Sequence, residues 1–231
     1  MNPIDPIKFA KNRAYPFVEG QQQALDEGRI TEAEWFENSN RTFTSLYLKT
    51  DNPRAQSGHS GDETQYRYTR MMILEAIHKN GTFLDVGCAN GYLMESLHRW
   101  LQGSELQLEF YGLDFSEELI ELAKKRLPSW QDRFYLGNAL EWTPQLPFDF
   151  VYMIGLELAP VQRQETLLNR LMDHFLTKCG RLILGPVTEE RESHEFELMV
   201  KPWGFKPGGF CMKSHLTQKN LAKKLFWFDK V

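Results

Sequence analysis

Short apolar runs alternate with amphipathic stretches through the middle of the chain. The run at 82–86 is apolar or β-branched at four of its positions, which predicts a buried parallel strand. The stretch at 92–101 places leucine and methionine at helical spacing, which predicts a helix. Gly87 and Gly91 bracket a tight loop between the two. Strand, glycine loop and helix together can present free backbone amides to a small polar ligand, although the glycines alone equally allow a sharp turn that binds nothing.

A second unit of the same kind follows. The apolar run at 110–113 predicts a strand that ends at Asp114, and Ser116 then suits the N-cap of a helix over 117–127. In doubly wound folds an acidic residue about 20 residues after the glycine loop binds the ribose, because one carboxylate accepts both hydroxyl protons. Asp114 lies 23 residues after Gly91. Alternatively, Asp114 only supports the turn before the helix.

The spacing of the glycines separates two classes of ligand. Dinucleotide enzymes typically show GxGxxG, whereas this loop reads GxxxG and has Asp85 two residues before its first glycine. A carboxylate there repels a pyrophosphate but attracts an ammonium or sulfonium group. The sequence DVGCANG therefore resembles motif I of the class I S-adenosylmethionine-dependent methyltransferases. Ala89 stands where that family often has a third glycine.

The resemblance extends downstream and covers roughly residues 70 to 186. FYLGNALEW, at 134–142, resembles the family's third strand and the loop beside the adenine. FDFVYMIGLEL, at 148–158, resembles the fourth strand, and a helix, a turn and the fifth strand follow within 167–185. GGFCMKS and LFWFDKV would be the last two strands. The resemblance thus implies a doubly wound α/β fold with a mostly parallel seven-stranded sheet, one antiparallel strand, helices on both faces and an N-terminal helical extension.

The same resemblance implies the cofactor S-adenosylmethionine, the product S-adenosylhomocysteine and a set of cofactor-binding positions. The two glycines would shape the loop under the methionine part, Asp85 would orient its amino group, Asp114 would hold the ribose, and 138–140 would border the adenine. The residues that match these positions are Asp85, Gly87, Cys88, Ala89, Gly91, Asp114, Phe115, Asn138, Ala139, Leu140, Ile154 and Gly155.

The first 62 residues form a predicted helical extension, and residues 63–231 the cofactor-binding domain. Thr31 and Glu34 predict a capping box for a helix whose aromatic face packs on the core or covers the cleft as a lid; that face comprises Trp35, Phe36, Phe43, Leu46 and Tyr47. Ser60 and Glu63 predict a second capping box. The loop residues expected at the mobile edge of the site are His59, Ser60 and Gly61. Alternatively, Ser60 and Asp62 only cap the helix and His59 faces solvent.

Methyl transfer needs the acceptor in line with the sulfonium methyl group, so positioning and water exclusion carry much of the catalysis. A hydroxyl acceptor also needs a general base, whereas a carboxylate does not. The weak candidates are His59, Tyr92 and Glu157, each of which has an equally plain structural interpretation. Neither HExxH nor a clustered His/Cys spacing occurs, so we expect no metal site. The absence of GxSxG and GxxxxGK[ST] likewise argues against a serine nucleophile and a phosphate-binding loop.

Charge and composition narrow the class of acceptor and the cellular compartment that we expect. The 27 basic and 31 acidic residues give a net charge of −4, which argues modestly against nucleic acid. Three cysteines without a paired pattern predict a reducing cytoplasm, and the sequence shows neither an export signal nor a membrane-length apolar run. The stretch at 187–204 is charged and irregular in pattern, and would be an insertion between the fifth strand and the closing hairpin.

The sequence therefore predicts a cytoplasmic methyltransferase that acts on the oxygen, nitrogen or carboxylate of a small molecule. A noncatalytic protein that binds S-adenosylmethionine or a protein partner is the alternative, and an NAD-type dinucleotide enzyme is a weaker one. The identity of the acceptor and the oligomeric state stay open.

Overall fold

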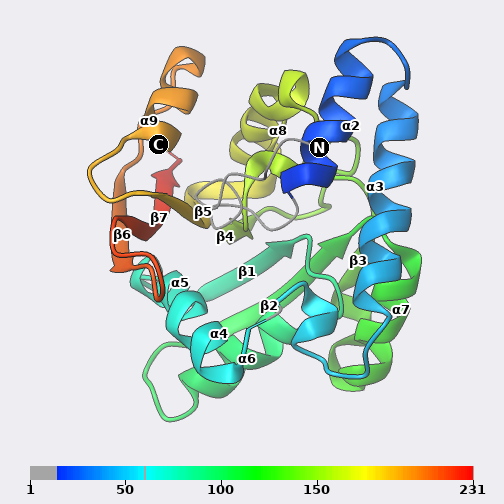
Figure 1. Ribbon diagram of the computed structural model, residues 1–231. Helices are drawn as coiled ribbons and strands as arrows, with labels where there is room; N and C mark the ends of the chain where they lie inside the picture. The colour runs from blue at the N-terminus through cyan, green and yellow to red at the C-terminus, as the bar shows by residue number, and fades with distance from the viewer. Residues whose placement is uncertain (1–14, 60, 231) are drawn as a thin grey trace.

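The computed structural model describes residues 15–59 and 61–230, apart from the side chain at 15. Its core is a seven-stranded sheet in the order β3-β2-β1-β4-β5-β7-β6 (Figure 1). The strands are β1 Gly81–Val86, β2 Leu108–Asp114, β3 Phe134–Leu136, β4 Phe148–Met153, β5 Leu176–Glu190, β6 Gly209–Ser214 and β7 Leu221–Asp229. Pairing is parallel from β3 to β5, while β7 runs antiparallel to both β5 and β6. The predicted fold, including its antiparallel strand, is confirmed.

Helices cover both faces of this sheet (Figure 1). They are α2 Tyr15–Asp26, α3 Glu32–Tyr47, α4 Glu63–Arg70, α5 Met72–Glu75, α6 Tyr92–Leu101, α7 Glu117–Arg126, α8 Gln164–Arg170 and α9 Glu195–Val200. One core cluster packs the four helices from α4 through α7 against the sheet, through residues such as Ile73, Met94 and Phe150. The other cluster packs α8 and α9 against the sheet through Leu168 and Phe196. With β1 and β4 buried between two apolar layers, the glycine loop after β1 has a rigid base.

Helix α3 crosses the carboxyl ends of the parallel strands and forms a helical pair with α2 (Figure 1). The capping box of Thr31 and Glu34 is present at its start, as predicted. Near its end the Thr44 hydroxyl donates a 2.7 Å hydrogen bond to Ser116 Oγ. The predicted aromatic face is wrong at Leu46, which is 51% exposed. Leu46 lies two residues after the buried Thr44, and that spacing places it on the opposite side of a helix.

Helix α4 begins without the predicted capping box of Ser60 and Glu63, and instead has the cap that the alternative interpretation named. Its N-cap is Asp62, whose side chain accepts a hydrogen bond from the Gln65 amide. The Glu63 carboxylate, expected to close a capping box, instead accepts hydrogen bonds from three more distant side chains. Ser60, the other half of that predicted box, lies outside the described residues. Tyr66 on this helix is directed into the core, since only 1% of this residue is exposed.

The stretch at 187–204 contains regular elements that its charged and irregular pattern did not indicate, and α9 lies in the insertion expected between the fifth strand and the closing hairpin. Strand β5 continues to Glu190 beyond a bulge between Leu184 and Val187, and α9 follows. The bulge interrupts the alternation of side chains, which is why the charged sequence concealed a strand. Buried Glu189 pairs with buried Lys224 at 3.1 Å and accepts a hydrogen bond from the Phe196 amide, so this ion pair attaches α9 to the sheet.

Candidate functional site

A cavity of about 130 Å³ lies at the carboxyl ends of β1, β2 and β4. We call the glycine loop and the strand ends around it the floor, and α3, the segment 52–59 and α4 the outer wall. The floor contributes Asp85, Val86, Gly87, Cys88, Ala89, Asp114, Phe115, Tyr152 and Ile154. The outer wall contributes Asn40, Phe43, Thr44, Tyr47, Ser57, Gly58, Tyr66 and Arg70. Residues from six separate stretches of the chain therefore meet around one space.

A smaller cavity of about 30 Å³ adjoins the first, and Asn138, Ala139 and Leu140 line it. The residues that line both cavities are Val86, Gly87, Asp114, Phe115 and Leu158. A Cβ atom on Gly87 would lie 2.9 Å from Leu158 Cδ1, and the backbone there has a φ of +80°. Only glycine fits this position without strain, because it has neither a Cβ atom nor a penalty for positive φ. The two cavities thus form one elongated site that passes over Gly87.

Backbone amides at the floor are fixed by the end of β2. The amides of Gly87 and Cys88 both donate to the carbonyl of Leu113, at 2.8 and 3.1 Å. Ala89 has a φ of +46°, so the family's preference for glycine at this position has a direct conformational reason here. Gly91, also left-handed, is the N-cap of α6. The loop between the two glycines is therefore held in one conformation before any ligand arrives.

Asp114 supports this loop and also faces both cavities. Its Oδ2 accepts a 2.8 Å hydrogen bond from the Ala89 amide, and its Oδ1 accepts one of 2.9 Å from the Ser116 amide. Burial raises the pKa of Asp114, while these amide hydrogen bonds act in the opposite direction. Each carboxylate oxygen has a second lone pair for a ligand. The turn-supporting role and a ligand-binding role are consequently compatible.

Asp85 is the second buried carboxyl group of the floor, with 3% exposure. Burial raises its pKa to about 7, the nearby Arg70 guanidinium opposes that rise, and the charge of Asp114 adds to it. The Arg70 guanidinium lies 5.8 Å from the centre of the Tyr66 ring. Among the described residues, no carboxylate lies within ion-pair distance of Arg70. A cation and a carboxyl group thus face the same cavity without neutralising each other by direct contact.

Tyr152 adds a hydroxyl group beside them. It is the register partner of Asp85 on the adjacent strand β4, so both side chains lie on the same face of the sheet. Its residue is 2% exposed, and its hydroxyl has no hydrogen-bond partner among the described residues. Burial raises its pKa, which keeps the hydroxyl protonated and able to donate. A buried donor that lacks a partner inside a cavity indicates a ligand atom, because leaving it unpaired is costly.

Sequence reasoning overlooked both Arg70 and Tyr152. Arg70 sits in a predicted helix among other charged residues, where nothing local marks one cation as cavity-facing. Tyr152 left a weak signal, since it is a phenol inside an otherwise apolar strand run.

None of the three base candidates lines either cavity as the described residues define them. The Tyr92 hydroxyl donates a 2.7 Å hydrogen bond to Glu63. Glu157 is exposed, and its carboxylate folds back over Gly155. The His59 ring packs edge-on against Tyr66, 5.0 Å between centres. The structure therefore does not bring these candidates together around a reacting atom.

Of the other predicted cofactor-binding residues, Cys88, Phe115 and Ile154 line the larger cavity, whereas Gly91 and Gly155 lie outside both linings. Over residues 15–59 and 61–230, no group of His, Cys, Asp and Glu side chains is arranged to hold a metal ion. Within the same part of the chain, no helix has the length and apolar character needed to cross a membrane.

Comparison with known proteins places this geometry in context. Residues 83–177 match the methyltransferase domain family. A tRNA U34 carboxymethyltransferase of Vibrio cholerae is 29% identical over 138 residues, which is 57% of this chain but only 40% of that protein. The chain thus spans less than half of the length of this curated relative.

Solved structures share the fold at low sequence identity. The 1,6-didemethyltoxoflavin-N1-methyltransferase of Burkholderia thailandensis, solved with S-adenosylhomocysteine, superimposes with a TM-score of 0.64 at 14% identity and covers 87% of this chain and 91% of its own. A methyltransferase of Geobacter sulfurreducens with the same ligand gives a TM-score of 0.52 at 12% identity, over 81% and 96% of the two chains. The family match spans the strand, glycine loop and helix that make the floor, so residues 83–177 are identified as a methyltransferase domain, and the solved structures show that the chain shares the fold of S-adenosylmethionine-dependent methyltransferases.

Proposed function

We propose that this protein binds S-adenosylmethionine in the elongated site and transfers its methyl group to a small molecule. The observation that carries the proposal is the pairing of two buried carboxyl groups, Asp85 and Asp114, with the cation of Arg70 around one cavity. These charges match a ligand that has a diol, an ammonium and a sulfonium group, and a carboxylate.

The methionine end of the cofactor fits the larger cavity. Asp85 attracts the ammonium group, and its carboxyl group would become fully ionised beside that cation. Arg70 and the Tyr152 hydroxyl supply donors for the carboxylate of the cofactor. This carboxylate would give the Tyr152 hydroxyl a hydrogen-bond partner and the Arg70 cation an ion-pair partner, which neither has among the described residues. The ribose diol would lie at Asp114, which retains lone pairs on both oxygens.

The adenine fits the smaller cavity. Ala139 and Leu140 are 8% and 6% exposed and provide apolar contacts. The Asn138 Oδ1 atom accepts a 3.0 Å hydrogen bond from the Leu140 amide, which fixes the side chain and leaves its amide nitrogen as a donor. This arrangement supports the predicted roles of 138–140.

The acceptor would enter between the sulfonium and the outer wall. When bound, the cofactor supplies an electrophilic methyl group, and cleavage of the carbon–sulfur bond leaves the electron pair on sulfur. The protein's contribution is alignment and exclusion of water. Burial raises the pKa of Tyr47 to about 12, so this wall residue donates a hydrogen bond at neutral pH and does not act as a base. An amine lone pair or a carboxylate suits such a site better than an unactivated hydroxyl.

A small acceptor is favoured by the likeness in size and fold to the toxoflavin enzyme, which is covered over 91% of its length. An RNA acceptor is the second candidate, because the curated relative acts on tRNA. We further propose that α2, α3 and the wall formed by 52–59, the described part of the extension expected over residues 1–62, close the site; residues 1–14 and 60 of that extension lie outside the described residues.

Calorimetric titration with S-adenosylmethionine, S-adenosylhomocysteine and NAD tests the cofactor without knowledge of the acceptor. We expect micromolar binding of both adenosyl compounds and none of NAD. Binding of NAD alone would overturn the proposal, and no binding of any of the three would favour a noncatalytic role. Transfer of labelled methyl groups to pools of small metabolites and of tRNA then separates the two acceptor classes.

A further inference from the structure

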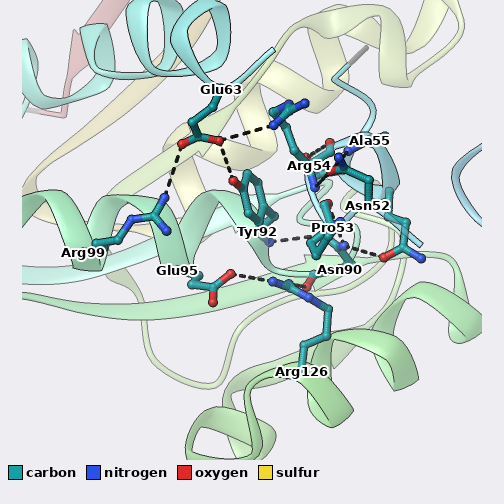
Figure 2. Close-up of polar contacts among 12 residues, drawn as sticks. Asn52, Pro53, Arg54, Ala55, Glu63, Asn90, Tyr92, Glu95, Arg99 and Arg126 are labelled. Atoms are coloured by element: carbon teal, nitrogen blue, oxygen red, sulfur yellow. Dashed lines mark hydrogen bonds and ion pairs between the residues drawn. The ribbon is translucent and has the colours of Figure 1, made fainter. Parts of the chain in front are cut away.

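Residues 52–59, which we call the wall segment, form part of the outer wall and approach the glycine loop (Figure 2). The segment contains a short 3-10 helix, Ala55–Ser57, and ends near Gly58, whose φ is +80°. A Cβ atom on Gly58 would lie 2.5 Å from the Tyr47 hydroxyl, so the segment touches α3 as well. Ser57 and Gly58 both line the larger cavity.

Asn90, between the two glycines of the floor, makes the direct connection to this segment (Figure 2). Its Nδ2 atom donates to the Pro53 carbonyl at 2.9 Å and to Gln56 Oε1 at 3.3 Å. Its Oδ1 atom accepts from the Tyr92 amide at 3.2 Å, in the first turn of α6. Asn90 is 0% exposed, so these hydrogen bonds do not compete with water.

Charged groups strengthen the same connection on both sides (Figure 2). Arg126 donates to the Asn90 carbonyl at 2.6 Å and to Glu95. Glu63 accepts from Tyr92 at 2.7 Å and lies 3.5 Å from Arg54 of the wall segment. Side chains from three separate stretches thus fix the wall segment relative to the floor.

We propose that Asn90 is a positioning residue that couples cofactor binding at the floor to closure of the wall segment over the cavity. Among the described residues, its side chain is the only one of the glycine loop that donates to the wall segment. Its Oδ1 atom accepts from the Tyr92 amide at the start of the helix that follows the loop. A cofactor that contacts this preformed loop is therefore linked through Asn90 to the wall segment, and stabilises the position in which Ser57 and Gly58 cover the cavity. This inference rests on the proposed function, since it requires a cofactor at the floor.

Two variants remove the connection in different ways. Asn90→Asp keeps an oxygen that caps α6 but loses both donated hydrogen bonds. Gln56→Leu removes one of the two acceptors, together with the 2.7 Å hydrogen bond that Gln56 Nε2 donates to the Thr50 carbonyl, and leaves every residue of the glycine loop unchanged; Gln56 is 8% exposed, so leucine suits its surroundings. The matched control is Asn80→Asp, because Asn80 is exposed, lies before β1 at the far end from the glycine loop, and uses only its Oδ1 atom to accept from the Gln107 amide.

The experiment combines calorimetry with limited trypsin digestion, with cleavage after Arg54 followed by mass spectrometry. Arg54 lies in the wall segment, and its side chain is 19% exposed, so cleavage requires the segment to open. In the wild type and Asn80→Asp, S-adenosylhomocysteine should slow this cleavage about tenfold. In Asn90→Asp and Gln56→Leu, the protection should largely disappear, and the dissociation constant should rise about fivefold to tenfold.

The outcomes distinguish this inference from the proposed function. If the wild type does not bind S-adenosylhomocysteine, the proposed function fails. If the wild type binds it, but both variants keep full affinity and full protection of Arg54, the coupling role of Asn90 is wrong. Should Asn90→Asp fail to fold, Gln56→Leu decides alone.

Discussion

The floor and the outer wall of the cavity are built in different ways. The floor comes mostly from strand ends, and its amides bond to carbonyl and carboxylate groups of neighbouring strands. The outer wall comes from α3, α4 and the wall segment, which are attached through side chains such as Thr44, Asn90 and Glu63. Backbone hydrogen bonds within a buried sheet open rarely, whereas a wall that is held by a few side-chain hydrogen bonds opens when those bonds break. Under the proposed function, this difference corresponds to a rigid cofactor site beneath a less rigid acceptor wall.

The largest expected effect comes from the floor. Asp114→Ala removes the proposed partner of the ribose diol, and loss of two hydrogen bonds to a charged group should weaken S-adenosylhomocysteine binding about 100-fold. Calorimetry measures this directly. Asp132→Ala changes an exposed aspartate and serves as the control. Near-unchanged affinity in folded Asp114→Ala would contradict the ribose assignment and the importance of the floor.

The outer wall should contribute less to the affinity for the cofactor, and only through the amino-acid end of the cofactor. Arg70→Met should weaken binding of S-adenosylhomocysteine about tenfold, because the carboxylate loses its cation. Binding of methylthioadenosine, which lacks the amino-acid group, should not change. Arg67→Met is the matched control on α4, since Arg67 is exposed and lies over Trp100 outside the cavity. Equal losses for both ligands would show that Arg70 supports the wall instead of binding the carboxylate.

Asp85 makes the floor sensitive to pH. Its folded pKa of about 7 means that the carboxyl group is increasingly protonated as the pH falls below about 7, so affinity for the ammonium group should fall there. Titrations of wild type and Asp85→Asn between about pH 6 and pH 8 measure this effect. A slope that persists unchanged in Asp85→Asn would assign it to another group.

The same pKa has a consequence for stability. Because the folded pKa lies above the ordinary value of 3.8 for an aspartate, the native state holds a proton that the unfolded state has lost between about pH 4 and pH 7. The Asp85 contribution to stability therefore falls as the pH rises through this window. Thermal melts should show a decline in the wild type, without cofactor, that is smaller in Asp85→Asn. Identical declines would contradict the buried state of this carboxyl group.

The smallest expected effect is at Ala89. Replacement by glycine relieves the positive φ of +46°, by about 1 kcal/mol, but increases the entropy of the unfolded chain by a similar amount. The free energy of unfolding should change by less than about 1 kcal/mol. Ala123→Gly, at a buried position inside α7, should instead destabilise by at least about 1 kcal/mol. Equal losses at both positions would show that the loop backbone is not strained.

The sequence alone determined the fold and most of the floor, because the relevant signals are local. Apolar strand runs, the GxxxG spacing and the N-cap at Ser116 each depend on a few adjacent residues. Thr31 and Glu34 likewise predicted the start of α3 correctly. Short-range patterns predict such elements well, since backbone geometry and burial in a sheet follow directly from them.

Only the tertiary structure decided which side chains meet across the cavity. Arg70 and Tyr152 are separated by a long stretch of chain but line the same space as Asp85, and the periodicity of neither α4 nor β4 indicates this meeting. His59, Tyr92 and Glu157 are directed elsewhere by contacts with Tyr66, Glu63 and Gly155. Nothing in the sequence around Asn90 indicates its hydrogen bonds to Pro53 and Gln56. Such contacts depend on how separate elements pack, and that information is not local to any part of the sequence.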